Sequence, residues 1–242
     1  MATSNWAALA DDLQGTLHLA TPPVAITFSD QRPEGVDAFE EPMAAPTPDG
    51  RTGRVPAGCV FWVKAAERTF STVPEDHGNC SVGRFTHGMA TLDDIADNSD
   101  VGELLNSGWV DMEAVLGIPS ISTPPGAVTY GPLHETTADP DVVLLRVNGR
   151  QMMVLGDALP GLRVEGKPQC HIVAIAKEQA TVAASVGCAL SRARTGMRPE
   201  EMTCAIPAQQ LGEVVEKLQG AAAIDTGVAK YAADDARRFA EP

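Results

Sequence analysis

Two pairs of cysteines recur in the sequence in the same frame, and their thiols are the best candidates for chemistry. The first pair is Cys59 and Cys80, and the second pair is Cys170 and Cys188. The second cysteine of each pair is followed at identical offsets by the same three residue types: Arg84, Gly88 and Met89 in the first half, and Arg192, Gly196 and Met197 in the second. These matches indicate one unit used twice, which would bring four thiols into related positions.

As metal ligands, these cysteines are predicted to hold an iron–sulfur cluster or another thiophilic metal. We expect such a centre to serve redox chemistry or to act as a Lewis acid on a small molecule. The spacing of the cysteines matches neither the Cys-x2–4-Cys knuckles of structural zinc sites nor the usual ferredoxin motifs. A common site therefore requires the fold to bring the two pairs together. The alternative is that cysteines meet only within each half.

A second hypothesis is a cysteine-dependent enzyme with Cys80 as the nucleophile and His77 as its base. His77 lies in a turn beside acidic residues, where a histidine is most often a solvated or hydrogen-bonded structural residue; the alternatives are a metal ligand and a helix cap together with Asp76. Arg84 and Arg192 follow a repeat cysteine by one helical turn, and are predicted to stabilise a thiolate or bind an anionic cofactor or ligand. The alternative for both arginines is a surface salt bridge.

A third hypothesis is a non-catalytic small-molecule-binding protein, in which the repeat cysteines are buried and the long loop from Ser29 to Gly58 closes over a ligand. Whether the protein is an enzyme stays open at this point. The fifth cysteine, Cys204, lies in an apolar run and has no counterpart in the first half. We expect it to be an inert core residue.

The elements around the cysteines follow one order in each half: strand, loop, helix, strand, cysteine, helix. Strands are predicted over 24–28, 69–73, 127–130, 142–145 and 180–186, and helices over 7–19, 59–67, 91–105, 170–178 and 199–218. This predicts an α/β or α+β fold, with two pseudo-symmetric repeats of mixed strands and helices forming one bilobal domain. The repeat cysteines would lie at helix starts, where unpaired N–H groups favour thiolates. Gly88 and Gly196 would end the cysteine-bearing helices.

The predicted boundaries divide the chain into five parts. They are an N-terminal helix over 1–21, repeat 1 over 22–108, a connecting segment over 109–139, repeat 2 over 140–220 and a C-terminal tail helix over 221–242.

Composition excludes several functional classes. A net charge of −14 argues against nucleic acid and anionic membranes as partners, because both need clustered Lys and Arg. The sequence has no apolar run long enough to span a membrane and no basic, then apolar, leader at its start. We therefore expect a cytoplasmic protein with unpaired cysteines. Its oligomeric state is open, with a homodimer among the options. Phosphate-binding glycine loops, nucleophile elbows and His-Glu-x-x-His motifs are absent.

Several motifs together resemble the DUF169 family of uncharacterised prokaryotic proteins, from about Pro22 to Leu218. The motifs are Asp76-His77-x-x-Cys80-x-x-Gly83, the isolated Cys59 and Cys170, Gly187-Cys188 followed by Arg192, and Ala205-Ile206-Pro207 before an amphipathic helix. Many members of this family carry another cysteine where this chain has Ser191, which disfavours a Cys-x-x-Cys element here. The resemblance implies a metal or iron–sulfur centre, or thiol chemistry, in a cytosolic protein.

Overall fold

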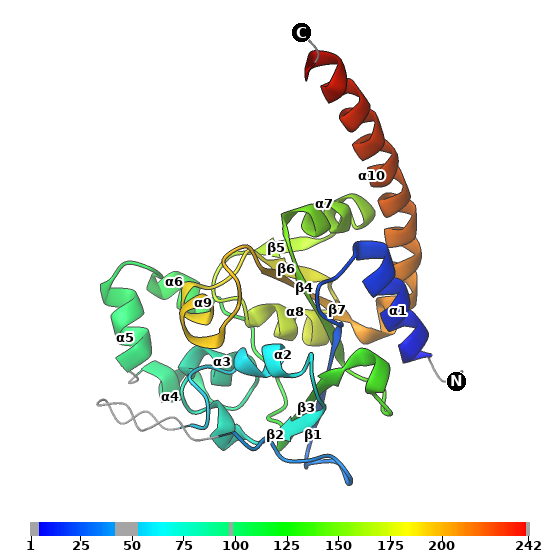
Figure 1. Ribbon diagram of the computed structural model, residues 1–242. Helices are drawn as coiled ribbons and strands as arrows, with labels where there is room; N and C mark the ends of the chain where they lie inside the picture. Colours follow the sequence, from blue (N-terminus) through cyan, green and yellow to red (C-terminus); the bar gives the residue numbers. More distant parts are fainter. Residues whose placement is uncertain (1–4, 42–52, 97–98, 241–242) are drawn as a thin grey trace.

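The protein is built on one seven-stranded sheet (Figure 1). In this computed structural model, residues 5–41, 53–96 and 99–240 are described. The strands are β1 (Val24–Ser29), β2 (Phe70–Thr72), β3 (Ala127–Pro132), β4 (Val142–Val147), β5 (Arg163–Glu165), β6 (Ala183–Ser185) and β7 (Met202–Pro207). Their order in the sheet is β2-β3-β1-β4-β7-β6-β5. β5 and β6 pair in parallel, and the other neighbours pair antiparallel.

Ten α-helices and three short 3-10 helices accompany the sheet in the described parts of the chain. The α-helices are α1 (Trp6–Leu17), α2 (Val60–Lys64), α3 (Ser81–Thr86), α4 (Leu92–Ala96), α5 (Ser99–Asn106), α6 (Met112–Leu116), α7 (Gly149–Ala158), α8 (His171–Gln179), α9 (Ala189–Thr195) and α10 (Leu211–Ala240). The 3-10 helices are η1 (Pro74–His77), η2 (Leu133–Glu135) and η3 (Ala208–Gln210). The predicted mixture of α and β structure is confirmed. None of the described helices is long and apolar enough to cross a membrane.

Two separate cores lie on the two faces of the sheet, because successive strand residues point to opposite sides. On β7, Cys204 and Ile206 pack with α1, α7 and α10, and we call this side the apolar face. Ala205, between them, packs with α2 and α8 on the other side. We call that side the thiol face, because Cys59 and Cys170 border its core.

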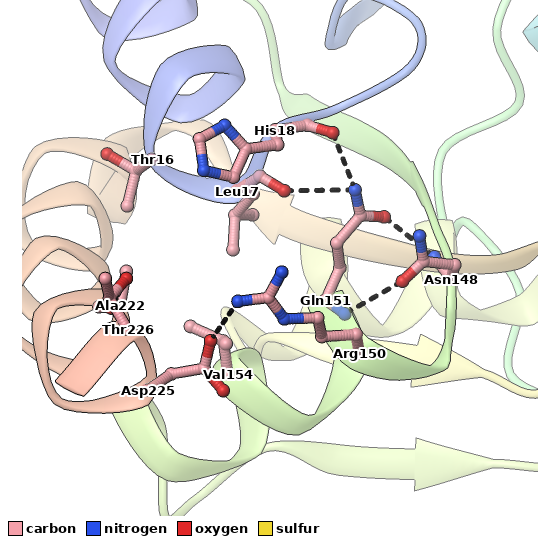
Figure 2. A pocket seen from close by; sticks show the side chains of 10 residues that line it. All are labelled: Thr16, Leu17, His18, Asn148, Arg150, Gln151, Val154, Ala222, Asp225 and Thr226. Atoms are coloured by element: carbon pink, nitrogen blue, oxygen red, sulfur yellow. Dashed lines mark hydrogen bonds and ion pairs between the residues drawn. The ribbon is translucent and has the colours of Figure 1, made fainter. Parts of the chain in front are cut away.

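Polar contacts at helix ends fix the elements of the apolar face (Figure 2). Asn148 caps α7, where it exchanges two hydrogen bonds with Gln151. The Gln151 amide also donates to the carbonyls of Leu17 and His18, which joins the end of α1 to α7. These groups border a small pocket of about 120 Å³ between α1, α7 and α10. Since Asn148 and Gln151 bond to each other, and Gln151 also bonds to the end of α1, we assign the pocket a structural role.

The strands of the two halves follow one another in corresponding order on either side of the central β1–β4 pair. β3 and β2 continue outward from β1, as β7 and β6 continue outward from β4. β5 extends the second half alone, and β3 comes from the predicted connecting segment 109–139. The strand order fits the predicted repeat. It does not establish that the two halves have the same three-dimensional structure, so the pseudo-symmetry and the boundaries of the repeats stay predictions.

The predicted helix over 199–218 is wrong in its first part. Residues Met202–Pro207 form β7, which pairs with β4 along its whole length and with β6. Its residues alternate between the two cores, and Pro207 ends the strand, where the missing N–H is tolerated. α10 begins only at Leu211 and continues to Ala240, so it includes the described part of the tail helix. α7 and β5 were not predicted at all.

Other local predictions are confirmed or fall partly outside the described residues. Gly88 and Gly196 follow the ends of α3 and α9 with φ of 73° and 77°, which is the left-handed conformation expected there. The predicted helix over 91–105 corresponds to α4 and α5 on either side of residues 97–98, which lie outside the described residues. Much of the loop proposed to close over a ligand also lies outside them, at residues 42–52.

Candidate functional site

Each repeat cysteine directly precedes a helix of the thiol face. Cys59 precedes α2, Cys80 precedes α3, Cys170 precedes α8 and Cys188 precedes α9. The predicted position at helix starts is therefore confirmed for all four cysteines. None of them is in a disulfide, and Cys188 is buried while the other three are partly buried.

The fold brings the four thiols together across the two halves. Negative charge on Cys80 or Cys188 would raise the pKa of both Cys59 and Cys170, and charge on Cys59 would raise the pKa of Cys170. Charge on Cys188 would likewise raise the pKa of Cys80. Each thiol is therefore within electrostatic reach of the other three. The helices agree, because α2 contacts α9 and α3 contacts α8.

The thiols share one neighbourhood without surrounding a single point. Within the described residues, no group of three or more His, Cys, Asp and Glu side chains has the geometry to hold a metal ion. The absence of a side chain at Gly83 leaves room for the Cys80 thiol, because a Cβ at this position would lie 3.1 Å from the Cys80 Sγ. The donor set itself, four thiols, suits soft metals and iron–sulfur clusters.

The predicted bias toward thiolates is wrong for three of these cysteines. Burial raises the pKa of Cys59 to about 12, and it also raises the pKa of Cys80 and, strongly, that of Cys170. Hydroxyl groups of Ser191 and Thr86, beside Cys59 and Cys170, offset part of this effect on each pKa. For these three thiols, the loss of hydration on burial outweighs any effect of the helix starts on the pKa.

His77 is the last residue of η1 and is 2% exposed. Its ring packs on Phe61 at 4.7 Å between centroids, and its Nε2 lies 3.0 Å from the Thr72 Oγ1. That hydroxyl donates to the Val128 carbonyl, so Nε2–H of His77 donates to Thr72. Burial lowers the pKa of His77 well below its usual value. The neutral ring therefore bonds to Thr72, and its role as a base for Cys80 stays a prediction.

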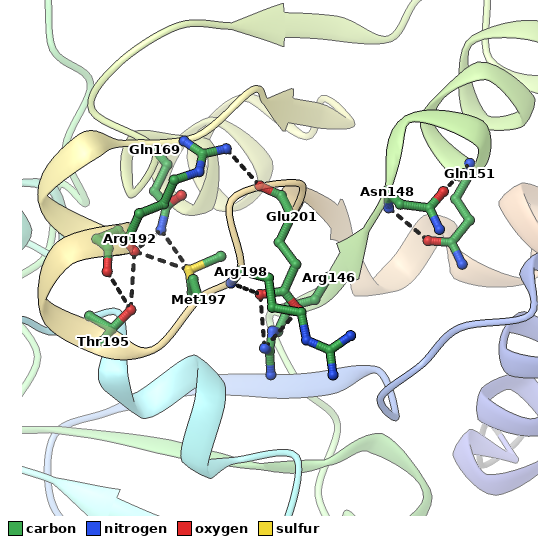
Figure 3. A network of polar contacts seen from close by, with 10 residues as sticks. Arg146, Asn148, Gln151, Gln169, Arg192, Thr195, Met197, Arg198 and Glu201 are labelled. Atoms are coloured by element: carbon green, nitrogen blue, oxygen red, sulfur yellow. Dashed lines mark hydrogen bonds and ion pairs between the residues drawn. The ribbon is translucent and has the colours of Figure 1, made fainter.

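The two predicted arginines lie in different surroundings. Arg192 donates to the carbonyls of Val186, Pro199 and Glu201, and so joins the segments before and after α9 (Figure 3). Arg84 lies on α3, where its charge contributes to lowering the pKa of His77. The described contacts thus give Arg192 a structural role, in which it holds together the segments on either side of α9. A role in cofactor binding stays a prediction for both.

A buried polar network that includes Gln169 and Met197 (Figure 3) holds Ser191 beside Cys59. The Gln169 amide donates to the Ser191 Oγ at 2.8 Å and to the Met197 Sδ at 3.2 Å, and Ser191 donates to the same sulfur at 3.0 Å. Sequence reasoning noted Ser191 only as a departure from the Cys-x-x-Cys pattern. Its neighbour Gln169, directly before Cys170, was missed. Both residues come from the second half, while Cys59 comes from the first.

Three further residues near the thiols were missed because nothing in the sequence marks them. Asp100 on α5 raises the pKa of Cys80, and Arg194 on α9, 3.9 Å from Asp100, lowers it in part. His87, directly after α3, is 4% exposed. Its Nδ1–H donates to the Gly83 carbonyl at 3.0 Å, and burial lowers its pKa to about 4. Its buried Nε2 has no hydrogen-bond partner among the described residues.

An open cavity of about 770 Å³ lies at the far end of α3. Phe85, Met89 and Ile121 form its apolar wall, and Asp93 and Asp94 add carboxylates. Met89 also packs against the core that Cys59 and Cys170 border. The volume is within the range of small-molecule sites, roughly 300–1,000 Å³. The thiol site thus has a cavity large enough for a small molecule in its neighbourhood.

Comparison with known proteins supports one relationship. No curated protein and no solved structure matches the chain. A family model described as DUF169, uncharacterised ArCR, matches residues 12–217 of the 242. This range contains all four thiols, the histidines beside them and the whole sheet. On this match the chain belongs to the DUF169 family.

Proposed function

We propose that Cys59, Cys80, Cys170 and Cys188 bind an iron–sulfur cluster or another thiophilic metal. The observation that carries this proposal is the convergence of the four thiols, two from each half, in one largely buried neighbourhood. Cysteines that served only as small apolar residues would have no reason to meet in this way. The fifth cysteine, Cys204, lies apart from them on the opposite face of the sheet.

The protonation of the thiols favours a metal over a free nucleophile. A thiol whose pKa is raised by burial is a poor nucleophile at neutral pH, because the thiolate is the reactive form. A metal cation replaces the protons and offsets the charge of the sulfurs that it binds. The same burial that argues against attack by Cys80 is therefore compatible with a metal site.

Among thiophilic groups we favour an iron–sulfur cluster. Such a cluster is held by cysteine thiolates and distributes them over several iron atoms. Sulfurs around one tetrahedral zinc, by contrast, lie only about 3.8 Å apart, given Zn–S bonds of roughly 2.3 Å. Since no group of the described residues has the geometry to hold a single metal ion, we favour the cluster, whose ligands are spread over several iron atoms.

A bound cluster would supply electron transfer or Lewis acidity, and the surrounding residues would tune and shield it. The four cysteines would hold the group, while Ser191 and Thr86 would place hydroxyls beside Cys59 and Cys170. The cavity next to Met89 would admit a small molecule, which we propose as the partner. Reduced, unpaired thiols and a net charge of −14 favour a cytoplasmic protein that does not bind nucleic acid.

Iron and sulfide analysis of protein purified without oxygen tests the proposal. We expect both elements in the wild type, together with a broad visible absorption. Cys80→Ser should lose both, whereas Cys204→Ala should retain them. Wild-type protein that stays colourless and metal-free after anaerobic reconstitution with iron and sulfide, and that binds no other thiophilic metal, would disprove it.

A further inference from the structure

A second open cavity, of about 520 Å³, lies beside the turn that joins α5 to α6. Its lining includes three large apolar side chains, those of Leu105, Trp109 and Met112, and one cation, Lys167, from the segment between β5 and α8. The volume is within the range of small-molecule sites, roughly 300–1,000 Å³. The cavity shares no lining residue with the one at the far end of α3, so it is a separate candidate site.

The end of α5 fixes the aromatic wall of this cavity. Gly108 follows the helix with a φ of 69°, a left-handed conformation that suits glycine. Its N–H donates to the Leu105 carbonyl at 3.0 Å, and the N–H of Trp109 donates to the Leu104 carbonyl at 3.1 Å. These two bonds form a Schellman motif, which closes the helix and turns the chain. The backbone of Trp109 is therefore held in place without a ligand.

Lys167 lies against this wall with its charge available. Its Nζ is 4.4 Å from the centroid of the Trp109 ring, which is within reach of a cation–π interaction. In the parts of the chain that the structure describes, this amine has no ion pair and no hydrogen bond. Asp111, the acid in the lining, instead caps α6 by accepting a hydrogen bond from the N–H of Ala114 at 2.7 Å. The lining thus offers a cation that its own acid does not neutralise.

The surroundings of this amine favour an anion that also carries apolar surface. A lysine side chain is flexible and strongly hydrated in water, whereas the Trp109 ring holds the amine of Lys167 at the cavity. A group that is already held loses less freedom when a ligand binds. The net charge of −14 repels anions from most of the molecule, so an anion needs a local cation to bind.

We propose that this cavity binds a small anionic molecule with an apolar, aromatic body. The anionic group pairs with Lys167, and the body contacts Leu105 and Met112. The Met112 side chain is 54% exposed, so it is accessible to such a molecule. The site goes beyond the proposed metal centre and does not depend on it.

Two fluorescent dyes with the same ring system test the proposal. Anilinonaphthalene sulfonate carries an anionic group, and N-phenylnaphthylamine lacks it. Both are titrated into the full chain, and their affinities are measured by dye fluorescence. Lys167→Gln removes the charge at an exposed position, where the change should leave the fold intact. Lys230→Gln is the matched control, on the exposed face of α10 and far from α5 and α6 (Figure 1).

We expect wild type to bind the sulfonate dye more tightly than the neutral dye. Lys167→Gln should bind the sulfonate dye about tenfold more weakly, the scale of one charge-assisted contact, and the neutral dye as wild type does. Lys230→Gln should match wild type with both dyes. Trp109→Leu should weaken the binding of both, because it removes the aromatic wall.

Three results would overturn the proposal. They are equal affinity of wild type and Lys167→Gln for the sulfonate dye, no preference of wild type for the sulfonate dye, and unchanged binding of both dyes by Trp109→Leu. Cys80→Ser, which should lose the metal, should bind both dyes as wild type does. The cavity and the metal centre can therefore be disproved separately.

Discussion

The two faces of the sheet use cysteine in opposite ways. On the apolar face, Cys204 of β7 lies fully buried among aliphatic side chains of α1, α7 and α10. On the thiol face, four cysteines meet near polar groups, and the Nε2 of His87 and the Oη of Tyr130 have no partner among the described residues. Burial raises the pKa of Cys204 to about 12, as it does for Cys59. Burial alone therefore does not distinguish a core thiol from a candidate metal ligand. The neighbouring residues do: a candidate ligand lies near other cysteines and polar groups.

The largest effect should come from replacing one cysteine on each face. Cys170→Ser removes the thiol whose pKa responds to all three other repeat cysteines, so we expect complete loss of bound metal. Cys204→Ser should retain the metal, at a cost of roughly 1–3 kcal/mol for a buried hydroxyl without a partner. Metal analysis and urea unfolding measure the two effects. Loss of metal from Cys204→Ser while its fold is retained would break the division between the faces.

The next largest effect should be confined to packing. Leu155 on α7 is 0% exposed in the core of the apolar face, so Leu155→Ala should lower the free energy of unfolding by about 2–5 kcal/mol. Leu116→Ala, at a position that is 65% exposed on α6, should change it by less than about 0.5 kcal/mol. Neither change should alter metal content per folded protein. A folded Leu155→Ala variant without metal would show that the two faces are coupled.

Acid should destabilise the metal-free protein, because buried histidines on the thiol face resist protonation in the folded state. His87 has a pKa of about 4 when folded and 6.5 as its ordinary value, because burial opposes its charge. The unfolded chain thus binds more protons between these values, and the stability that neutral His87 provides is lost as pH falls from about 6.5 toward 4. The loss amounts to about 3 kcal/mol, at 1.36 kcal/mol per pKa unit. Buried His77, whose pKa is also lowered, acts in the same direction.

Urea unfolding at pH 7 and pH 5 measures this loss. His87→Gln should reduce the difference between the two pH values, while His134→Gln, at a side chain that is 45% exposed, should leave it unchanged. Equal pH dependence in wild type and His87→Gln would place the acid sensitivity elsewhere.

The contrast between the faces also explains what the sequence could predict. The repeat cysteines and their helices were predictable, because Cys59 and Cys170 directly precede apolar runs, and because Cys80 and Cys188 are followed by the same residue types at the same offsets. Whether Cys59 and Cys170 meet was not, since it depends on β1 pairing with β4, more than a hundred residues away along the chain. β7 was taken for helix because Met202 to Ile206 is short and apolar, and its pairing with β4 and β6 decides its conformation.

Burial and partnership are likewise tertiary properties. The pKa of Cys80 was predicted in the wrong direction because the helix start is local, whereas burial depends on elements from both halves. The orphaned groups of Tyr130 and His87 were not predictable at all, because the lack of a partner becomes apparent only when every neighbour is placed. Gln169 left no signal for the same reason: its partners Ser191 and Met197 follow it by more than twenty residues.

The smallest effect compares one substitution, glycine to alanine, in a helix of each face. A Cβ added to Gly156 on α7 would lie in open space, so Gly156→Ala should raise the free energy of unfolding by about 0.5–1 kcal/mol through helix propensity alone. Gly83→Ala on α3 should raise the free energy of unfolding by less, because the new methyl group would lie 3.1 Å from the Cys80 Sγ and displace it. Gly83→Ala should therefore weaken metal binding several-fold, whereas Gly156→Ala should not. Equal metal affinity in the two variants would mean that the position of the Cys80 sulfur is not critical for metal binding. The metal site would then tolerate displacement of one of its four proposed ligands.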